Sequence, residues 1–199
     1  MKAVAICGSP RQAGNTEFLL RRCLRKIEEG GIGTEFVPLH GKTIKGCIAC
    51  QRCGKTKDGI CSVKDDDFGP IFENIKAADI VVVGSPVYFG SATPEMMAVL
   101  HRAGYVSKAN GKLLCRKLGG PIVVARRAGQ NFTFAQLLYW YLINDMIVPG
   151  STYWNIAFGR TPGEVEKDEE GLRTVERFAE NLVWLAGRVC PMPDNPVCR

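Results

Sequence analysis

The sequence is poor in histidine and has no long hydrophobic run, and each shortage excludes a class of protein. The two histidines, His40 and His101, lie far apart without an evident partner, so no histidine-based catalytic triad is predicted. The most apolar stretch, residues 80–89, is interrupted by Gly-Ser-Pro and falls short of the ~20 residues that cross a bilayer. Residues 1–7 are too short for the apolar core of a signal peptide. We therefore expect a cytoplasmic protein without a membrane segment.

The sequence also lacks a concentration of charge of one sign. It has 26 basic and 20 acidic residues, and the net charge of +6 favours anionic partners in general. The densest basic group, within residues 21–26, lies opposite the apolar face of a predicted helix, as is typical of a solvated surface. We therefore expect no nucleic-acid partner.

Cysteine, by contrast, is abundant. Nine cysteines in a chain without an export signal indicate metal binding or redox work rather than disulfides. Four of them lie close together, at Cys47, Cys50, Cys53 and Cys61, and the other five are scattered. Two of the scattered ones, Cys190 and Cys198, belong to a proline-rich tail over residues 190–199, which we expect to form an irregular arm. There they would be free thiols, additional ligands or partner contacts.

Apolar periodicity alternates between strand and helix along one domain, residues 1–189. The pattern predicts a five-stranded, parallel, doubly wound α/β sheet, with ligands bound beyond the carboxyl ends of its strands. Residues 40–66 show no periodicity, and the acidic run 65–67 is expected to cap the helix that follows. The predicted strands are 2–7, 34–39, 80–84, 121–125 and an interrupted 146–148 with 152–158; the predicted helices are 16–29, 67–77, 93–103, 134–142 and 165–189.

The loop after the first strand has the composition of a phosphate cradle. Small and hydroxylic residues at a helix N-terminus leave backbone N–H groups exposed, and Arg11 adds a guanidinium. The loop is not a Walker A motif, because the Gly-Lys-Ser/Thr ending is missing, and it is not a Rossmann fingerprint. Cys7 at the strand end suggests a phosphatase nucleophile, but Ala13 stands where a C-x5-R loop needs arginine. Cys7 is therefore interpreted as a core residue.

Two further loops follow the predicted third and fourth strands. In residues 85–91, Tyr88 and Phe89 offer an apolar edge to a planar ring, while backbone groups meet its polar atoms. In residues 125–130, backbone donors or an arginine would face the electron-accepting end of such a ring. Taken alone, each of these loops is also compatible with an ordinary turn.

The S-P-R-x-x-G-N-T and S-P-V-Y-F-G loops together resemble the NADPH-dependent FMN reductase branch of the flavodoxin-like superfamily, over nearly the whole chain. The resemblance implies strand order 2-1-3-4-5 and bound FMN. In the third loop, Arg126 and Arg127 replace the small residues of the family pattern. The implied phosphate-binding residues are Ser9, Arg11, Gly14, Asn15 and Thr16, and the implied ring-binding residues are Pro86, Val87, Tyr88, Phe89, Gly90, Arg127 and Gly129.

The clustered cysteines have the spacing C-x2-C-x2-C-x7-C. Two-residue gaps let successive thiolates converge on one centre, and the fourth closes the cage, as in a cubane iron-sulfur cluster. The spacing resembles that of the iron-sulfur flavoproteins, a subgroup of the same family, which implies that Cys47, Cys50, Cys53 and Cys61 ligate a 4Fe-4S cluster. Tetrahedral zinc and metal-free thiols are the alternatives.

These features predict an oxidoreductase that couples one-electron and two-electron carriers through FMN and a 4Fe-4S cluster. No side chain is assigned as a catalytic acid or base, because the cofactors supply the chemistry. The partner would be a redox protein such as a ferredoxin, or NAD(P)H, and the resemblance implies a homodimer or homotetramer. The alternatives are a cluster-free NAD(P)H-dependent FMN or quinone reductase, and a zinc-stabilised interaction domain.

Overall fold

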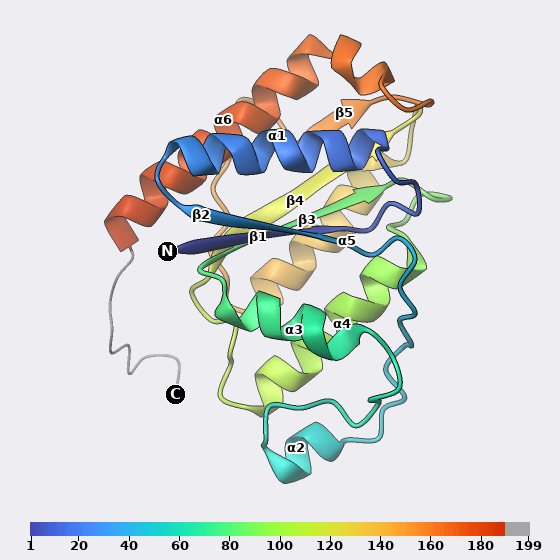
Figure 1. The fold of residues 1–199 in the computed structure, drawn as a ribbon, viewed down its shortest axis with the longest axis vertical. Helices are drawn as coiled ribbons and strands as arrows, with labels where there is room; N and C mark the ends of the chain where they lie inside the picture. Colours follow the sequence, from blue (N-terminus) through green and yellow to red (C-terminus); the bar gives the residue numbers. More distant parts are fainter. Residues whose placement is uncertain (190–199) are drawn as a thin grey trace.

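The computed structural model describes residues 1–189 and contains a five-stranded parallel sheet in the order β2-β1-β3-β4-β5 (Figure 1). The predicted flavodoxin-like α/β fold and strand order are confirmed. The strands are β1 (Lys2–Cys7), β2 (Gly33–Pro38), β3 (Ile80–Pro86), β4 (Leu118–Ala125) and β5 (Ile156–Phe158). The helices are α1 (Asn15–Glu29), α2 (Arg52–Thr56), α3 (Phe68–Ala77), α4 (Pro94–Ala109), α5 (Gln130–Ile143) and α6 (Glu169–Val189), and a 3-10 turn η1 (Glu164–Lys167) precedes α6.

Helices cover both faces of the sheet. On one face α1 and α6 pack against the strands, and on the other lie α3, α4 and α5 (Figure 1). Successive residues of β1 alternate between the two cores: Val4 packs toward α3 to α5, and Ala5 packs toward α1 and α6. The central strands are buried on both sides for this reason, which explains their unbroken apolar sequences.

The last strand is shorter than predicted. Only Ile156–Phe158 pairs with β4, while Ile147 forms an isolated bridge to Leu118. The intervening Pro149 has no N–H to donate, and the Asn155 side chain instead donates to the Pro121 carbonyl at 3.2 Å. The chain therefore leaves the edge of β4 after Ile147 and rejoins it near Ile156.

Three helix boundaries differ from the prediction by four residues or more, and the first is that of α5, which begins at Gln130 rather than at residue 134. The last helix begins at Glu169 rather than at residue 165, because the Asp168 carboxylate accepts the Gly171 N–H at 2.9 Å and caps it there. The helix α4 continues to Ala109. It thereby reaches the segment between β2 and α3, which runs along α4 and contains the unpredicted short helix α2 (Figure 1).

The acidic run before α3 holds this segment in place more than it caps the helix, which corrects the capping prediction. Asp67 is the N-cap residue, yet its carboxylate accepts the Thr43 N–H at 2.8 Å. Asp66 accepts the Lys45 N–H at 2.9 Å and reaches the first helical N–H at 3.3 Å. The carboxylates therefore tie the start of the segment to its end.

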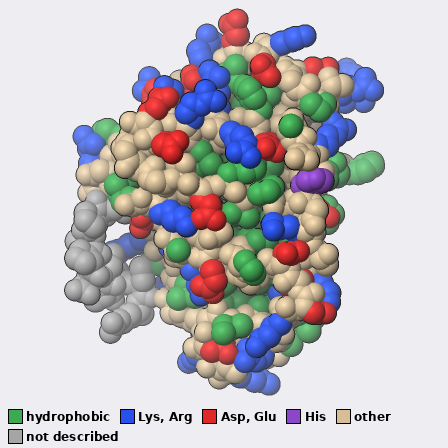
Figure 2. Space-filling model, viewed as in Figure 1, with side chains coloured by type: hydrophobic (Ala, Val, Ile, Leu, Met, Phe, Trp, Pro, Cys, Tyr) green, Lys and Arg blue, Asp and Glu red, His purple; other side chains and the backbone are tan. Residues whose placement is uncertain are grey.

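On the face shown in Figure 2, basic and acidic side chains are interspersed rather than gathered by sign. None of the helices in residues 1–189 combines the length and apolar character needed to cross a membrane. The predicted C-terminal arm, with Cys190 and Cys198, lies outside the described residues.

Candidate functional site

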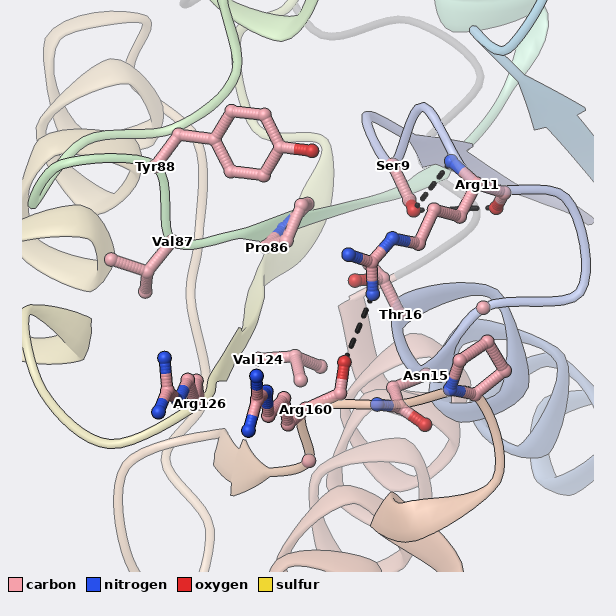
Figure 3. A pocket seen from close by; sticks show the side chains of 13 residues that line it. Ser9, Arg11, Asn15, Thr16, Pro86, Val87, Tyr88, Val124, Arg126 and Arg160 are labelled. Atoms are coloured by element: carbon pink, nitrogen blue, oxygen red, sulfur yellow. Dashed lines mark hydrogen bonds between the residues drawn. The ribbon is translucent and has the colours of Figure 1, made fainter.

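A cavity of about 250 Å³ opens at the carboxyl ends of the strands, where the loops after β1, β3, β4 and β5 meet (Figure 3). The structure brings together most of the residues predicted from the first two loops, although these segments lie far apart in the chain. The predicted residues that line it are Ser9, Arg11, Gly14, Asn15, Thr16, Pro86, Val87 and Tyr88.

One end of the cavity is suited to an anion. It lies at the N-terminus of α1, whose N-cap residue Gly14 has no side chain to bind the N–H groups of the first turn. The Ser9 hydroxyl accepts the Arg11 N–H at 3.2 Å and shapes the turn that leads there. The Thr16 hydroxyl has no hydrogen-bond partner within residues 1–189 and lines the cavity, so it is free to bind a ligand.

Arg11 and Asn15 both reach the loop after β5. The Arg11 guanidinium donates to the Arg160 carbonyl at 2.9 Å (Figure 3). The Asn15 amide donates to the Thr161 carbonyl at 2.9 Å, and its oxygen accepts the Val165 N–H at 3.4 Å. Because both ends of the Asn15 amide are engaged, this residue positions the wall of the cavity.

The other end of the cavity has an apolar wall. Pro86, Val87 and Tyr88 form one wall, and Val124 and Arg126 lie across from them (Figure 3). Gly129 holds the two loops together: it has φ +87°, and a Cβ there would lie 2.9 Å from the Val87 side chain. This close approach explains why a glycine occupies the position.

Four predicted residues lie outside this cavity. Phe89, Gly90 and Arg127 line an adjoining open hollow, while Gly129 supports the loops from behind. Phe89 is fully exposed at the loop tip, with φ +51°. The lining residues that were not assigned from the sequence are Val124, Arg126, Gly159, Arg160 and Pro162. Three of them follow β5, and the rule that ligands bind beyond strand ends applies to this loop as well.

The loop after β5 is shaped by Glu164. Its carboxylate accepts the Arg160 N–H at 2.6 Å, the Thr161 N–H at 3.1 Å and the Thr161 hydroxyl at 2.7 Å. These bonds lower the pKa of Glu164 to about 2, and the bond from the Thr161 hydroxyl has the largest effect. The ionised carboxylate therefore fixes the loop that carries Arg160.

Replacing Glu164 with glutamine is expected to destabilise the protein in a pH-dependent way. Because the folded-state pKa lies below the ordinary 4.5, the stabilisation is fully present above pH 4.5 and is lost as the pH falls toward 2. The difference in free energy of unfolding between parent and Glu164→Gln, measured in urea, should be larger at pH 7 than at pH 3. Glu170→Gln, which removes an exposed carboxylate from α6, is the matched control. A difference of the same size at both pH values would contradict this role.

The four clustered thiols line a second cavity, of about 130 Å³, between the segment after β2 and α4. Cys47 and Cys50 are exposed, and Cys53 and Cys61 are half-buried. The Cys50 sulfur lies 2.9 Å from the Ser62 hydroxyl, a hydrogen bond that lowers the pKa of Cys50. Within residues 1–189 no three or more His, Cys, Asp or Glu side chains stand as close as the ligands of one metal ion. The thiols thus share one cavity without enclosing a single-ion site.

The remaining described free thiols are unsuited to chemistry. Burial raises the pKa of Cys7 and of Cys23 to about 12, and both side chains lie in the core. A nucleophilic cysteine needs a lowered pKa and access to substrate, so the phosphatase interpretation of Cys7 finds no support.

Comparisons with known proteins agree with this geometry. A family model described as NADPH-dependent FMN reductase matches residues 1–161. An iron-sulfur flavoprotein of Methanocaldococcus jannaschii is 35% identical over 189 residues, covering 92% of this chain and 95% of the relative. One from Archaeoglobus fulgidus is 36% identical over 199 residues, covering 92% and 98%. Among solved structures, RosB with a bound formyl-riboflavin phosphate superimposes with TM-score 0.71 at 18% identity, covering 95% of this chain and 81% of that one.

The alignments cover almost the whole length of both sequence relatives, and the structural likeness supports the flavodoxin-like fold. Two features of the structure agree with these matches: the cavity at the sheet edge and the four thiols beside α4. The chain is therefore a flavin-binding oxidoreductase that belongs to the iron-sulfur flavoprotein subgroup of the NADPH-dependent FMN reductase family.

Proposed function

We propose that this protein transfers electrons between one-electron and two-electron carriers, with FMN at the sheet edge and a 4Fe-4S cluster in the thiol cavity. The observation that carries the proposal is the presence of two distinct cavities in one chain, one lined by the flavin loops and one by all four clustered thiols. FMN exchanges one or two electrons, whereas an iron-sulfur cluster passes one at a time.

The residues at the sheet edge fit FMN in charge and in shape. The α1 N-terminus, Arg11 and the Thr16 hydroxyl would hold the phosphate, because each offers a donor or a positive charge. Pro86, Val87 and Tyr88 would pack against the ring. The chain's own contribution is to bind, orient and shield the flavin, and no described side chain is needed as an acid or base.

The donor set of the second cavity fits an iron-sulfur cluster. All four clustered thiols line this cavity, and cysteine thiolates are the ligands that hold such clusters. The three cysteines at two-residue gaps also differ from the two separated C-x2-C pairs that are typical of structural zinc sites. Cys47, Cys50, Cys53 and Cys61 would hold the cluster.

We also propose that the protein assembles as a homodimer or homotetramer and exchanges electrons with a ferredoxin-like protein or NAD(P)H. Large apolar side chains on α5 support an assembly, since Phe132, Tyr139 and Ile143 are each more than half exposed. The exposed positive charge beside the apolar wall, at Arg126 and Arg127, suits an anionic partner.

The proposal is tested by an absorption spectrum of protein purified without oxygen, with FMN, iron and sulfide counted on the same sample. We expect a flavin spectrum overlaid on broad brown absorption, with about four irons per chain, as one cubane requires. Flavin without iron or sulfide would overturn the cluster and favour the cluster-free NAD(P)H-dependent reductase. A colourless protein that retains zinc would favour the interaction domain instead.

A further inference from the structure

A buried arginine lies beneath the thiol cavity. Arg102 projects from the middle of α4, and its side chain is fully buried together with that of Asp66. Its guanidinium also stacks on the Phe68 ring, with 3.9 Å between the guanidinium carbon and the ring centroid. Burying a charge is costly unless the charge is paired and its N–H groups have hydrogen-bond partners.

All five N–H donors of Arg102 have partners. Nε donates to the Cys61 sulfur at 3.4 Å. One terminal nitrogen donates to the Lys45 carbonyl at 3.0 Å and to Asp66. The other donates to the Val63 carbonyl at 2.7 Å and to the second Asp66 oxygen at 3.2 Å. The planar fork therefore contacts a thiol, two carbonyls and a carboxylate at once.

These partners lie at the two ends of the segment that carries the thiols. Lys45 precedes Cys47 by two residues, and Val63 follows Cys61 by two residues. Arg102 thus closes the neck of the loop that contains Cys47, Cys50, Cys53 and Cys61. A contact at the C-terminal end of α4 supports the middle of this loop: the Asn110 side chain accepts the Gly59 N–H at 2.8 Å.

We propose that Arg102 is the positioning residue of the thiol site: it closes the loop before a cluster is bound, and its Nε–H acts on the bound cluster through the Cys61 sulfur. The second half of this proposal rests on the proposed function, and the first half does not. A hydrogen bond from a cation to a ligating sulfur favours the more negative, reduced state of a cluster. Arg102 therefore raises the reduction potential as well as ordering the loop.

The first arm of the test uses cluster-free protein, so that it does not depend on iron. Hydrogen exchange of residues 46–62 is measured in the parent, Arg102→Lys and Arg102→Gln. We expect exchange to accelerate at least about tenfold in both variants, because neither side chain can bridge both ends of the loop. Lys64→Ala is the matched control, since it removes an exposed side chain next to Val63 and keeps the Val63 carbonyl that Arg102 binds. Unchanged exchange in both variants would overturn the loop-closing role.

The second arm uses protein prepared without oxygen. We expect Arg102→Gln to change the ratio of oxidised to reduced cluster about tenfold at a fixed potential. For one electron, this corresponds to a reduction potential lowered by about 59 mV. We expect Arg102→Lys to lower it less. A potential that is unchanged in Arg102→Gln would overturn the role toward Cys61.

Two precautions separate the possible failures. If the Arg102 variants do not fold, Asp66→Asn keeps the size of the partner and removes its charge: it should accelerate exchange in the first arm, and it should raise the cluster potential in the second, because it leaves the positive charge of Arg102 uncompensated beside Cys61. If the parent itself binds no iron, the proposed function fails, while the exchange measurement still decides whether Arg102 closes the loop.

Discussion

Replacing Arg11 with alanine is expected to raise the dissociation constant of FMN by about 10-fold to 100-fold and to leave iron and sulfide unchanged. The guanidinium lies at the anion end of the cavity, and hydrogen bonds to charged groups contribute about 1.5–3 kcal/mol. Each 1.4 kcal/mol corresponds to a factor of ten in affinity. The thiol cavity is built from a different loop and α4, so it should not respond.

The measurement is a titration of flavin-free protein with FMN and, separately, with riboflavin, which lacks the phosphate. Arg11→Ala should weaken FMN binding strongly and riboflavin binding little. Arg25→Ala, which removes an exposed arginine from the outer face of the same helix, is the matched control. An equal loss for both flavins would mean that Arg11 acts by bracing the Arg160 loop rather than by binding phosphate.

Replacing Cys50 with alanine is expected to have the converse effect: iron should fall from about four to less than one per chain, with FMN affinity unchanged. A cubane held by four thiolates loses one of its anchors, and the exposed position of Cys50 leaves the cluster open to solvent on that side. Alanine is preferred to serine here because a serine oxygen is itself a possible ligand.

Iron, sulfide and FMN are counted in parallel in protein handled without oxygen. The matched control is Ser62→Ala, which removes the hydroxyl 2.9 Å from the Cys50 sulfur but retains the thiol, and it should keep its iron. Full iron content in Cys50→Ala would show that Cys50 is not a ligand. Loss of FMN in the same variant would show that the two sites are not independent.

The fold was predictable because its causes are local in the chain. An unbroken apolar run such as residues 80–84 indicates a strand buried on both faces, and helical spacing of apolar residues indicates an amphipathic helix. The short β5 was predicted too long, since the propensity of residues 152–155 for strand is overridden by Asn155, whose side chain binds the Pro121 carbonyl, and by the loop that leaves the edge of β4 before it. Short helices such as α2 carry too few residues for a periodic pattern.

The loops that line the sheet-edge cavity and the cysteine set were also visible in the sequence, because each consists of closely spaced residues. Ser9 to Thr16 form one continuous turn into a helix, and the four cysteines are separated by short gaps. Contacts between residues far apart in the chain were not visible: Arg160, distant in sequence, lines the cavity at the sheet edge, and Asn15 binds the loop that carries it.

Arg102 shows the difference most clearly. In the sequence it is one basic residue on a helix, where a solvated position is the ordinary expectation. In the folded protein the cysteine loop packs along α4, and Arg102 lies between the two ends of that loop. Local patterns thus predicted the strands, the longer helices and most residues that line the two cavities. The pairing of Arg102 with Asp66 and Cys61 arose only through packing, because a buried charge acquires its role from neighbours that a linear pattern does not contain.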